Sequence, residues 1–324
     1  MKKIATVTLF IMSMVAANVH LPVASAQTFP SRPIRFVVPY APGGGADIVA
    51  RAIGLKLSAS MGQPVIVDNR PGGGTIIGTE IAAVSAPDGY TLFMATGSHT
   101  SNPSLYKKLP YDTESAFAPV SLVASSPFLL VVNPDLPVHS VAELVSYAKT
   151  HKLNYGLSAY GAPDHLGMEL LKYLMNIDVT PIPYKGAGLA LTDLIGGQIQ
   201  VMFVNIVAAS SQVQSGRVRA LAVSTIKRSE LMPALPTIAE SVAPGFDVSA
   251  WSGVLVRAGT PPEIIARLQR EIVESLNATD VREQFLKMGA GRVGSTPSEF
   301  GEFLALDTEK WRHLVEKANI QVDR

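Results

Sequence analysis

Short apolar runs alternate with amphipathic helical patterns along most of the chain. Residues 34–38 form an apolar run typical of a buried strand, and residues 47–61 place Ile48, Ala52 and Leu55 on one face of a helix. The expected elements of this part are strands 34–38, 64–67 and 90–95 and helices 47–61 and 75–84. This βαβαβ order predicts a mostly parallel sheet with helices on both faces.

The same alternation returns in the second half of the chain. Ser140 and Glu143 have the spacing of a capping box, which predicts a helix to about residue 150. The other expected elements are strands 153–158, 179–184, 199–205 and 219–223 and helices 165–175, 262–276, 281–288 and 298–317.

Two long β-like runs, 120–132 and 246–256, are interpreted as strands that cross between two lobes. Lobe 1 is then expected to comprise residues 27–125 plus 250–324, and lobe 2 residues 126–249. The predicted fold class is α/β, with two doubly wound lobes joined by two crossing strands. Such lobes leave a ligand cleft between them and can move as a hinge.

The first 26 residues have the features of a secretory signal peptide. Two lysines precede an apolar run over residues 4–17, and Ala24, Ser25 and Ala26 supply the small residues of a cleavage site. A buried N-terminal helix is the alternative, which Pro22 disfavours. We expect cleavage after about Ala26 and a periplasmic protein, with full secretion left open.

Composition narrows the class of protein. Hydrophobic residues make up 47% of the 324 residues and charged residues 16%, which is typical of a globular chain. Without Lys2 and Lys3 the chain has 25 basic and 26 acidic residues, a net charge of −1, so no nucleic-acid partner is expected. Cysteine is absent from the sequence, which excludes disulfides, thiolate metal ligands and cysteine nucleophiles.

A Pro-Gly-Gly-Gly element at 42–45 recurs at 71–74, each time between a predicted strand and a helix. The first copy lacks the Lys and Ser or Thr of a P-loop, and Ile48 stands where the dinucleotide motif needs glycine. Both loops should lie at the carboxyl edge of the sheet, where helix N-termini favour anions. We therefore expect backbone N–H groups to capture a carboxylate. Asp47 is either an N-cap or a ligand contact, and both roles can coexist.

The remaining candidate residues give weaker evidence for catalysis or ligand binding. Ser158 resembles a nucleophile elbow, but Tyr160 stands where that motif needs glycine, so Ser158 is expected to donate a hydrogen bond instead. The six histidines have no metal-ligand spacing, and neither a metal nor a cofactor is expected. His165 is interpreted as support for a helix start. Lys185 either meets an anionic ligand or is a solvated turn residue, and Trp251 is interpreted as a core or hinge residue.

Several motifs follow one another along the chain in an order that is typical of one protein family. They are PIRFVVPYAPGGGAD at 33–47, GQPVIVDNRPG at 62–72, PDGYTL at 87–92, LPYD at 109–112, PYKG at 183–186, RALAV at 219–223, AGTP at 258–261 and TPSEF at 296–300. The chain closely resembles the Bug (TctC-like) family of extracytoplasmic solute receptors, which serve tripartite tricarboxylate transporters. The resemblance implies a type II periplasmic-binding-protein-like fold that closes on a di- or tricarboxylate, an acidic amino acid or an aromatic acid. It also implies membrane subunits of such a transporter as partners, and a monomer is expected.

The motifs and the resemblance together give the candidate ligand-binding residues. They are Tyr40, Pro42, Gly43, Gly44, Gly45, Asp47, Gly74, Thr75, Thr96, Gly97, Ser98, Ser158, Ala159, Tyr160, Gly161, Ala162, His165, Lys185 and Asn205. One departure is Val204, where many relatives carry Asp; this loss of an acid slightly weakens an amino-acid ligand and leaves a simple or aromatic carboxylate open. The expected function is capture and delivery of a small carboxylate without catalysis. The alternatives are a receptor that signals to a sensor kinase and a hydrolase.

Overall fold

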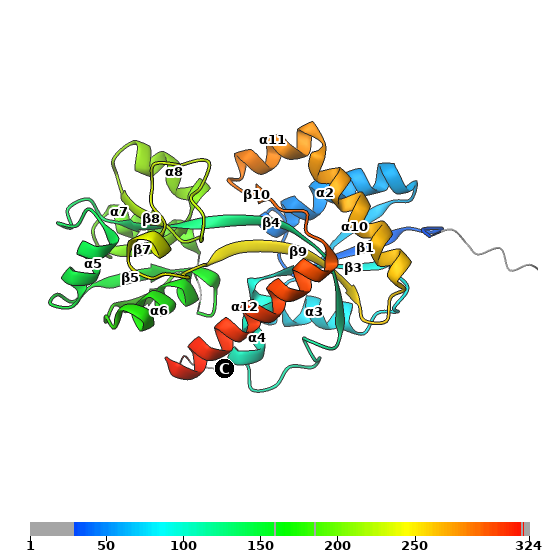
Figure 1. Cartoon of the computed structure of the whole chain (residues 1–324), viewed down its shortest axis with the longest axis horizontal. Helices are drawn as coiled ribbons and strands as arrows, with labels where there is room; N and C mark the ends of the chain where they lie inside the picture. The colour runs from blue at the N-terminus through cyan, green and yellow to red at the C-terminus, as the bar shows by residue number, and fades with distance from the viewer. Residues whose placement is uncertain (1–28, 159, 185, 319, 321–324) are drawn as a thin grey trace, which may run out of the picture.

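The computed structural model describes residues 29–158, 160–184, 186–318 and 320, so the predicted signal peptide lies outside the described residues. The described chain forms two α/β lobes, at the right and left of Figure 1, joined by two long strands. Lobe 1 contains strands β1 (Ile34–Val38), β2 (Val65–Asn69), β3 (Thr91–Thr96) and β10 (Gly291–Arg292). Lobe 2 contains strands β5 (Asn154–Leu157), β6 (Thr180–Pro183), β7 (Val201–Asn205) and β8 (Arg219–Val223).

Parallel pairing dominates each lobe away from the junction. In lobe 1, β1 lies between β2 and β3 and is parallel to both; in lobe 2, β5 lies between β6 and β7 and is parallel to both. The helices of lobe 1 are α2 (Gly45–Met61), the 3-10 turn η1 (Gly73–Thr75), α3 (Ile76–Ala83), α4 (Gly97–Leu105), α10 (Pro262–Asn277) and α11 (Thr279–Lys287). Those of lobe 2 are α5 (Val141–Ala148), α6 (Pro163–Met175), α7 (Ala187–Ile195), α8 (Ile206–Gln214) and α9 (Ile238–Ser241).

The lobes are joined by the antiparallel strands β4 (Phe117–Val132) and β9 (Ser249–Arg257). The first part of β4 pairs with β9 and β10; its last five residues pair with β7, and the last four of these also pair with β8. The predicted lobe boundaries fall inside β4 and at the start of β9. Because successive side chains of a strand point to opposite faces, this ribbon presents one row of side chains to each side of the junction.

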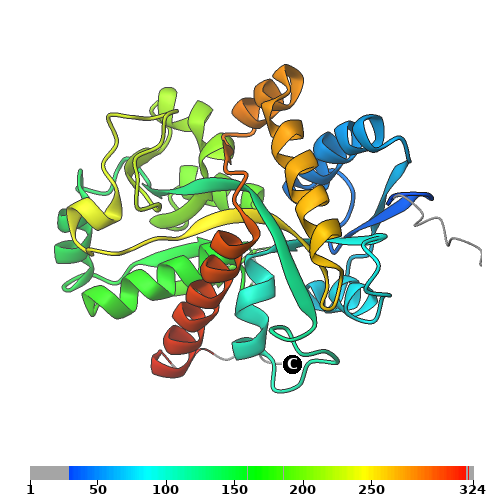
Figure 2. The ribbon, with the colours of Figure 1, turned by 45° about the vertical axis from the view of Figure 1, so that its right-hand side comes forward.

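A third element crosses the junction, which the sequence pattern did not anticipate. Helix α12 (Pro297–Lys317) runs diagonally beneath β4 and β9 in Figure 1 and stands in front of them in Figure 2. Its first half packs Phe300 into a lobe 1 cluster with Trp251, whereas Trp311 and Leu314 belong to the core of lobe 2. The helix therefore contributes to both cores.

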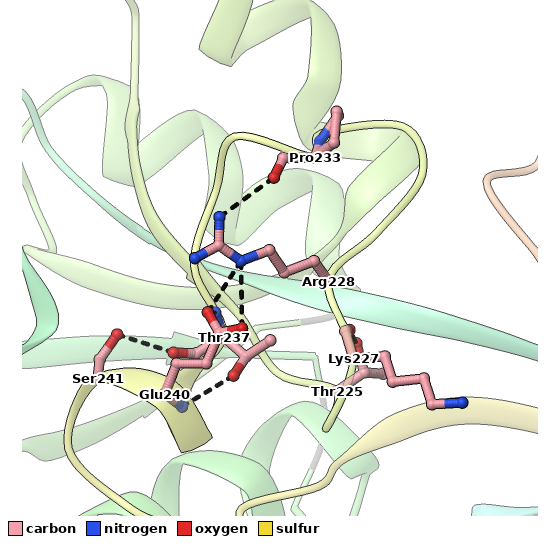
Figure 3. A network of polar contacts seen from close by, with 7 residues as sticks. All are labelled: Thr225, Lys227, Arg228, Pro233, Thr237, Glu240 and Ser241. Carbon is pink, nitrogen blue, oxygen red and sulfur yellow. Dashed lines mark hydrogen bonds and ion pairs between the residues drawn. The ribbon is translucent and has the colours of Figure 1, made fainter.

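Local capping stabilises the loops around this framework. Ser140 accepts a hydrogen bond from the Glu143 N–H, as the sequence spacing predicted. In lobe 2, Thr237 and Glu240 form a full capping box at the start of α9. Figure 3 shows Arg228 reaching Glu240 and the carbonyl oxygen of Pro233, which ties the loop between β8 and α9 to the helix. Within the described residues, we find no helix that combines the length and the apolar character required to span a bilayer.

Candidate functional site

A cavity of about 330 Å³ lies at the junction of the two lobes and is called the main cavity here. The hinge strands form part of its wall, through Ala124, Ser126 and Phe128 of β4 and Ala250 and Trp251 of β9. Its size is within the range of small-ligand pockets. The cavity is therefore placed where rotation about β4 and β9 would open or close it.

Helix N-termini from both lobes reach the main cavity. Lobe 1 contributes Gly44 and Gly45 at the start of α2 and Gly97 at the start of α4. Lobe 2 contributes Ala187 at the start of α7 and Asn205 at the start of α8. The first N–H groups of a helix have no partner within the helix, and the helix dipole makes this end electropositive. The wall thus offers donors for an anion without a guanidinium or ammonium group among its described residues.

The remaining wall is largely apolar. Val49, Phe128, Phe203, Trp251 and Met288 line it, and all except Met288 are buried. Such side chains favour an apolar ligand body over water. The cavity therefore combines electropositive helix ends with an aromatic and aliphatic surface.

Tyr40 holds two strand ends together at the cavity. Its hydroxyl lies 2.7 Å from Oγ1 of Thr96 and 3.2 Å from Oγ of Ser98. Tyr40 and Thr96 line the main cavity. These hydrogen bonds fix the loop after β1 against the end of β3 and the first turn of α4, so the starts of α2 and α4 are held in one arrangement.

The side chain of Asn205 is largely occupied by hydrogen bonds within the protein. Its Oδ1 caps α8 by accepting the Val207 N–H at 3.0 Å, and its Nδ2 donates to Oγ of Ser126 at 3.1 Å. Ser126 in turn donates to the carbonyl oxygen of Gly289. One N–H of the Asn205 amide stays available to a ligand.

Ser158 is engaged by Asp164 rather than placed as a free donor. The Ser158 N–H donates to Oδ2 of Asp164 at 2.6 Å, and the hydroxyl donates to Oδ1 at 2.8 Å. The hydroxyl therefore donates a hydrogen bond, as expected, but to Asp164 within the protein, and its contact with a ligand stays a prediction. Both residues line the main cavity. Burial raises the pKa of Asp164, and the hydrogen bonds from Ser158 oppose that effect.

Asp47 organises its loop and does not line the cavity. Gly44 is the N-cap of α2, so the expectation that Asp47 is the N-cap is wrong. Asp47 lies in the first turn of α2, where its carboxylate accepts the Gly43 N–H at 2.8 Å and pairs with Arg51. Burial alone would raise the pKa of Asp47, but Arg51, Gly43 and Asn69 outweigh it and hold the pKa below its ordinary value.

The second glycine loop reaches a neighbouring cavity of about 490 Å³, called the outer cavity here. Tyr40, Ser158 and Pro163 line both cavities. The predicted site residues on the wall of the outer cavity alone are Gly74, Thr75, Ser98, Tyr160, Gly161 and Ala162. The two loops therefore meet adjoining cavities rather than one common surface.

The remaining predicted residues lie elsewhere. Pro42, Gly43 and His165 line neither cavity. His165 accepts the Gly161 N–H on Nδ1 at 3.1 Å, just ahead of α6, which agrees with its interpretation as support for a helix start. Burial lowers its pKa to about 4. Ala159 and Lys185 lie outside the described residues. Among those described, no group of three or more His, Asp or Glu side chains is arranged to hold a metal ion.

Sequence reasoning missed most of the apolar wall. Phe128, Phe203 and Met288 carry no motif, and Trp251 was interpreted as a core or hinge residue rather than as a ligand platform. Trp251 is indeed buried, but it also lines the main cavity. Its place on the cavity wall could have been predicted from the position of Trp251 in a crossing strand, because a strand that joins two lobes passes the cleft between them.

The fold and this site define a class: a two-lobed solute-binding protein with the type II periplasmic-binding fold. Comparison with known families then identifies the group, because residues 49–320 match the model of the tripartite tricarboxylate transporter family receptors, TctC. The chain belongs to this family, to which the sequence motifs also pointed.

Individual relatives agree with this assignment. Protein BugT of Bordetella pertussis is 38% identical over 310 residues, covering 94% of this chain and 95% of BugT. The R. palustris protein Rpa4515, solved with adipate, is 34% identical with a TM-score of 0.76 and covers 90% of this chain and 99% of its own. MatC from Rhodopseudomonas palustris, solved with bound malate, is 32% identical with a TM-score of 0.73, covering 89% of this chain and 100% of its own.

Proposed function

We propose that this protein is a periplasmic receptor that captures a small organic carboxylate in the main cavity and delivers it to the membrane subunits of a tripartite tricarboxylate transporter. The observation that carries the proposal is the convergence of helix N-termini from both lobes on one cavity. A carboxylate held there bridges the lobes, so its binding free energy favours the closed arrangement. The adipate and malate in two related structures support this ligand class.

A hydrolase is not supported by the geometry. A serine nucleophile needs a base that takes its proton, usually a histidine. The Ser158 hydroxyl donates instead to Asp164, and the Nδ1 of His165 accepts a backbone N–H. We propose a role in binding in which no bond of the ligand is made or broken.

A thermal-shift screen of the protein without residues 1–26 against organic acids tests the proposal. A true ligand raises the unfolding midpoint progressively above its dissociation constant. Stabilisation by no carboxylate in the screen would contradict carboxylate capture. Deleting the gene separates the two receptor roles, since a transport receptor is needed for uptake and a signalling receptor only for induction of other genes.

Gly44→Val tests the site. Gly44 lies on the cavity wall with φ −76° and ψ 166°, an extended conformation that valine adopts readily. Near its Cβ the closest atom is the carbonyl oxygen of Ala41 at 3.7 Å, so the fold should tolerate the change. We expect ligand binding to be lost while the unfolding midpoint without ligand is nearly unchanged. Unchanged binding would remove this loop from the site.

A further inference from the structure

One carboxylate on the wall of the main cavity lacks a basic partner in the protein. The described residues contain four buried acids, Asp47, Asp164, Glu271 and Asp307. Three of them form ion pairs: Asp47 with Arg51 at 3.0 Å, Glu271 with Arg267 at 2.7 Å and Asp307 with Lys310 at 2.6 Å. Asp164 has no such pair within the described residues, which leave out Lys185, and it alone of the four lines the cavity.

Comparison of Asp164 with Asp47 shows what is missing. Each lies in the first turn of a helix and accepts a backbone N–H from the preceding loop. Four residues after Asp47 the chain has Arg51, which neutralises it; four residues after Asp164 it has Met168. Buried charges are normally paired, because an isolated one loses its hydration without compensation. The hydrogen bonds from Ser158 satisfy some lone pairs but bring no positive charge.

The position of Asp164 relative to the helix ends of lobe 1 gives the site its polarity. A Cβ placed on Gly97, at the start of α4, would lie 3.2 Å from Cγ of Pro163. The electropositive end of α4 therefore faces the residue next to Asp164 across the junction. Lobe 1 thus offers N–H donors for a carboxylate, and lobe 2 presents a carboxylate of its own in addition to the starts of α7 and α8.

Resting on the proposed capture of a carboxylate, we infer that the ligand also carries an ammonium group, which pairs with Asp164, and is an amino acid with an apolar side chain. On this cavity wall, Asp164 supplies an acid in place of the one whose loss at Val204 weakens an amino-acid ligand. Its carboxylate lies toward the starts of α2 and α4, and its ammonium group lies toward Asp164. The side chain lies against Phe128, Phe203 and Trp251. Burial raises the pKa of Asp164, and an ammonium group beside it would stabilise the charged form of this carboxylate.

The test compares pairs of acids that differ only in the ammonium group: phenylalanine with 3-phenylpropanoate, leucine with 4-methylpentanoate, and aspartate with succinate. Isothermal titration of the protein without residues 1–26 should show tighter binding of the amino member, by about tenfold or more for a desolvated charge pair. The apolar pairs should bind more tightly than the aspartate pair. In Asp164→Asn the preference should disappear, chiefly through weaker binding of the amino acid.

Asn keeps the shape of the side chain and can still accept from Ser158, so folding should survive and is checked by the unfolding midpoint. Lys185→Met tests whether Lys185 is the partner of Asp164; if it is not, the preference for the amino member stays as in wild type. A preference that appears only in Lys185→Met would make Lys185 the partner of Asp164 and overturn the inference. The inference is also overturned if succinate, 3-phenylpropanoate or 4-methylpentanoate binds the wild-type protein as tightly as its amino counterpart. That result would still be consistent with the capture of a carboxylate. Binding of no acid at all contradicts the proposed function itself.

Discussion

The indole N–H of Trp251 donates a hydrogen bond to Oδ2 of Asp307 across 3.2 Å, which connects the wall of the main cavity with helix α12. The same oxygen accepts from Trp311 at 3.1 Å and from the Thr100 hydroxyl at 2.6 Å, and Oδ1 pairs with Lys310. Strand β9, helix α4 and helix α12 are thus tied to one buried carboxylate at the junction of the lobes.

Asp307→Ala should therefore be strongly destabilising. It leaves the donors of Trp251, Trp311 and Thr100 without their acceptor and Lys310 without its partner. We expect a loss of about 3–5 kcal/mol in the free energy of unfolding, the usual cost of breaking a buried charged network. Urea denaturation measures it. Glu309→Ala, which removes an exposed ion pair with Arg312, is the control and should leave the free energy of unfolding nearly unchanged. Equal effects would show that the Asp307 network adds little.

The two tryptophans of the chain give a direct reporter of binding. Trp251 lines the cavity, whereas Trp311 lies in the core of lobe 2. Titration with a ligand found in the screen should change the intrinsic fluorescence of wild type and of Trp311→Phe. The change should vanish in Trp251→Phe. A signal that follows Trp311 instead would place the ligand elsewhere.

The contact between Gly97 and Pro163 should limit closure of the lobes. In Gly97→Ala the added methyl would lie 3.2 Å from Cγ of the rigid proline ring and oppose close approach. Overpacking of this kind costs about 1–3 kcal/mol, so we expect ligand affinity to fall by about tenfold, measured by isothermal titration. Gly188→Ala is the matched control, since among the described residues beyond its own stretch of helix no atom lies within 4 Å of its added Cβ. It should keep full affinity; a similar loss in both variants would argue against a closing contact at Gly97.

Stability should decrease as pH falls, partly through His99. Burial lowers the pKa of this imidazole to about 4, against about 6.5 in the unfolded chain. Between these values the unfolded state binds more protons, so the contribution of neutral His99 is full above pH 6.5 and is lost as pH falls toward 4. Urea denaturation of wild type should show lower stability at pH 5 than at pH 7. His99→Phe, which keeps a ring between Phe93 and Phe117, should show a smaller difference. An identical pH dependence would mean that His99 is not buried as a neutral group.

Hydrophobic periodicity predicted most elements to within a few residues, because strands and helices with one buried face leave that period in the sequence. Strands β1 and β8 have the predicted bounds, and helix α12 begins one residue earlier than expected. Helix α4 was missed, although its start forms part of the site. Its sequence, GSHTSNPSL, is polar and contains Pro103, so neither period nor propensity predicts a helix there. Packing against α12 and β3 stabilises it instead.

The sequence by itself determined the glycine-rich turns, the two crossing strands and the family, since these depend on local backbone chemistry and on the order of motifs. Only the tertiary structure decided what each turn does. Asp47 and Asp164 have similar local settings, yet folding placed Asp47 behind its loop beside Arg51 and Asp164 on the cavity wall. The same is true of Trp251, whose hydrophobicity predicted burial but not which cavity it lines. Charge pairing and cavity shape depend on residues distant in sequence, and only the packing of the lobes brings those residues together.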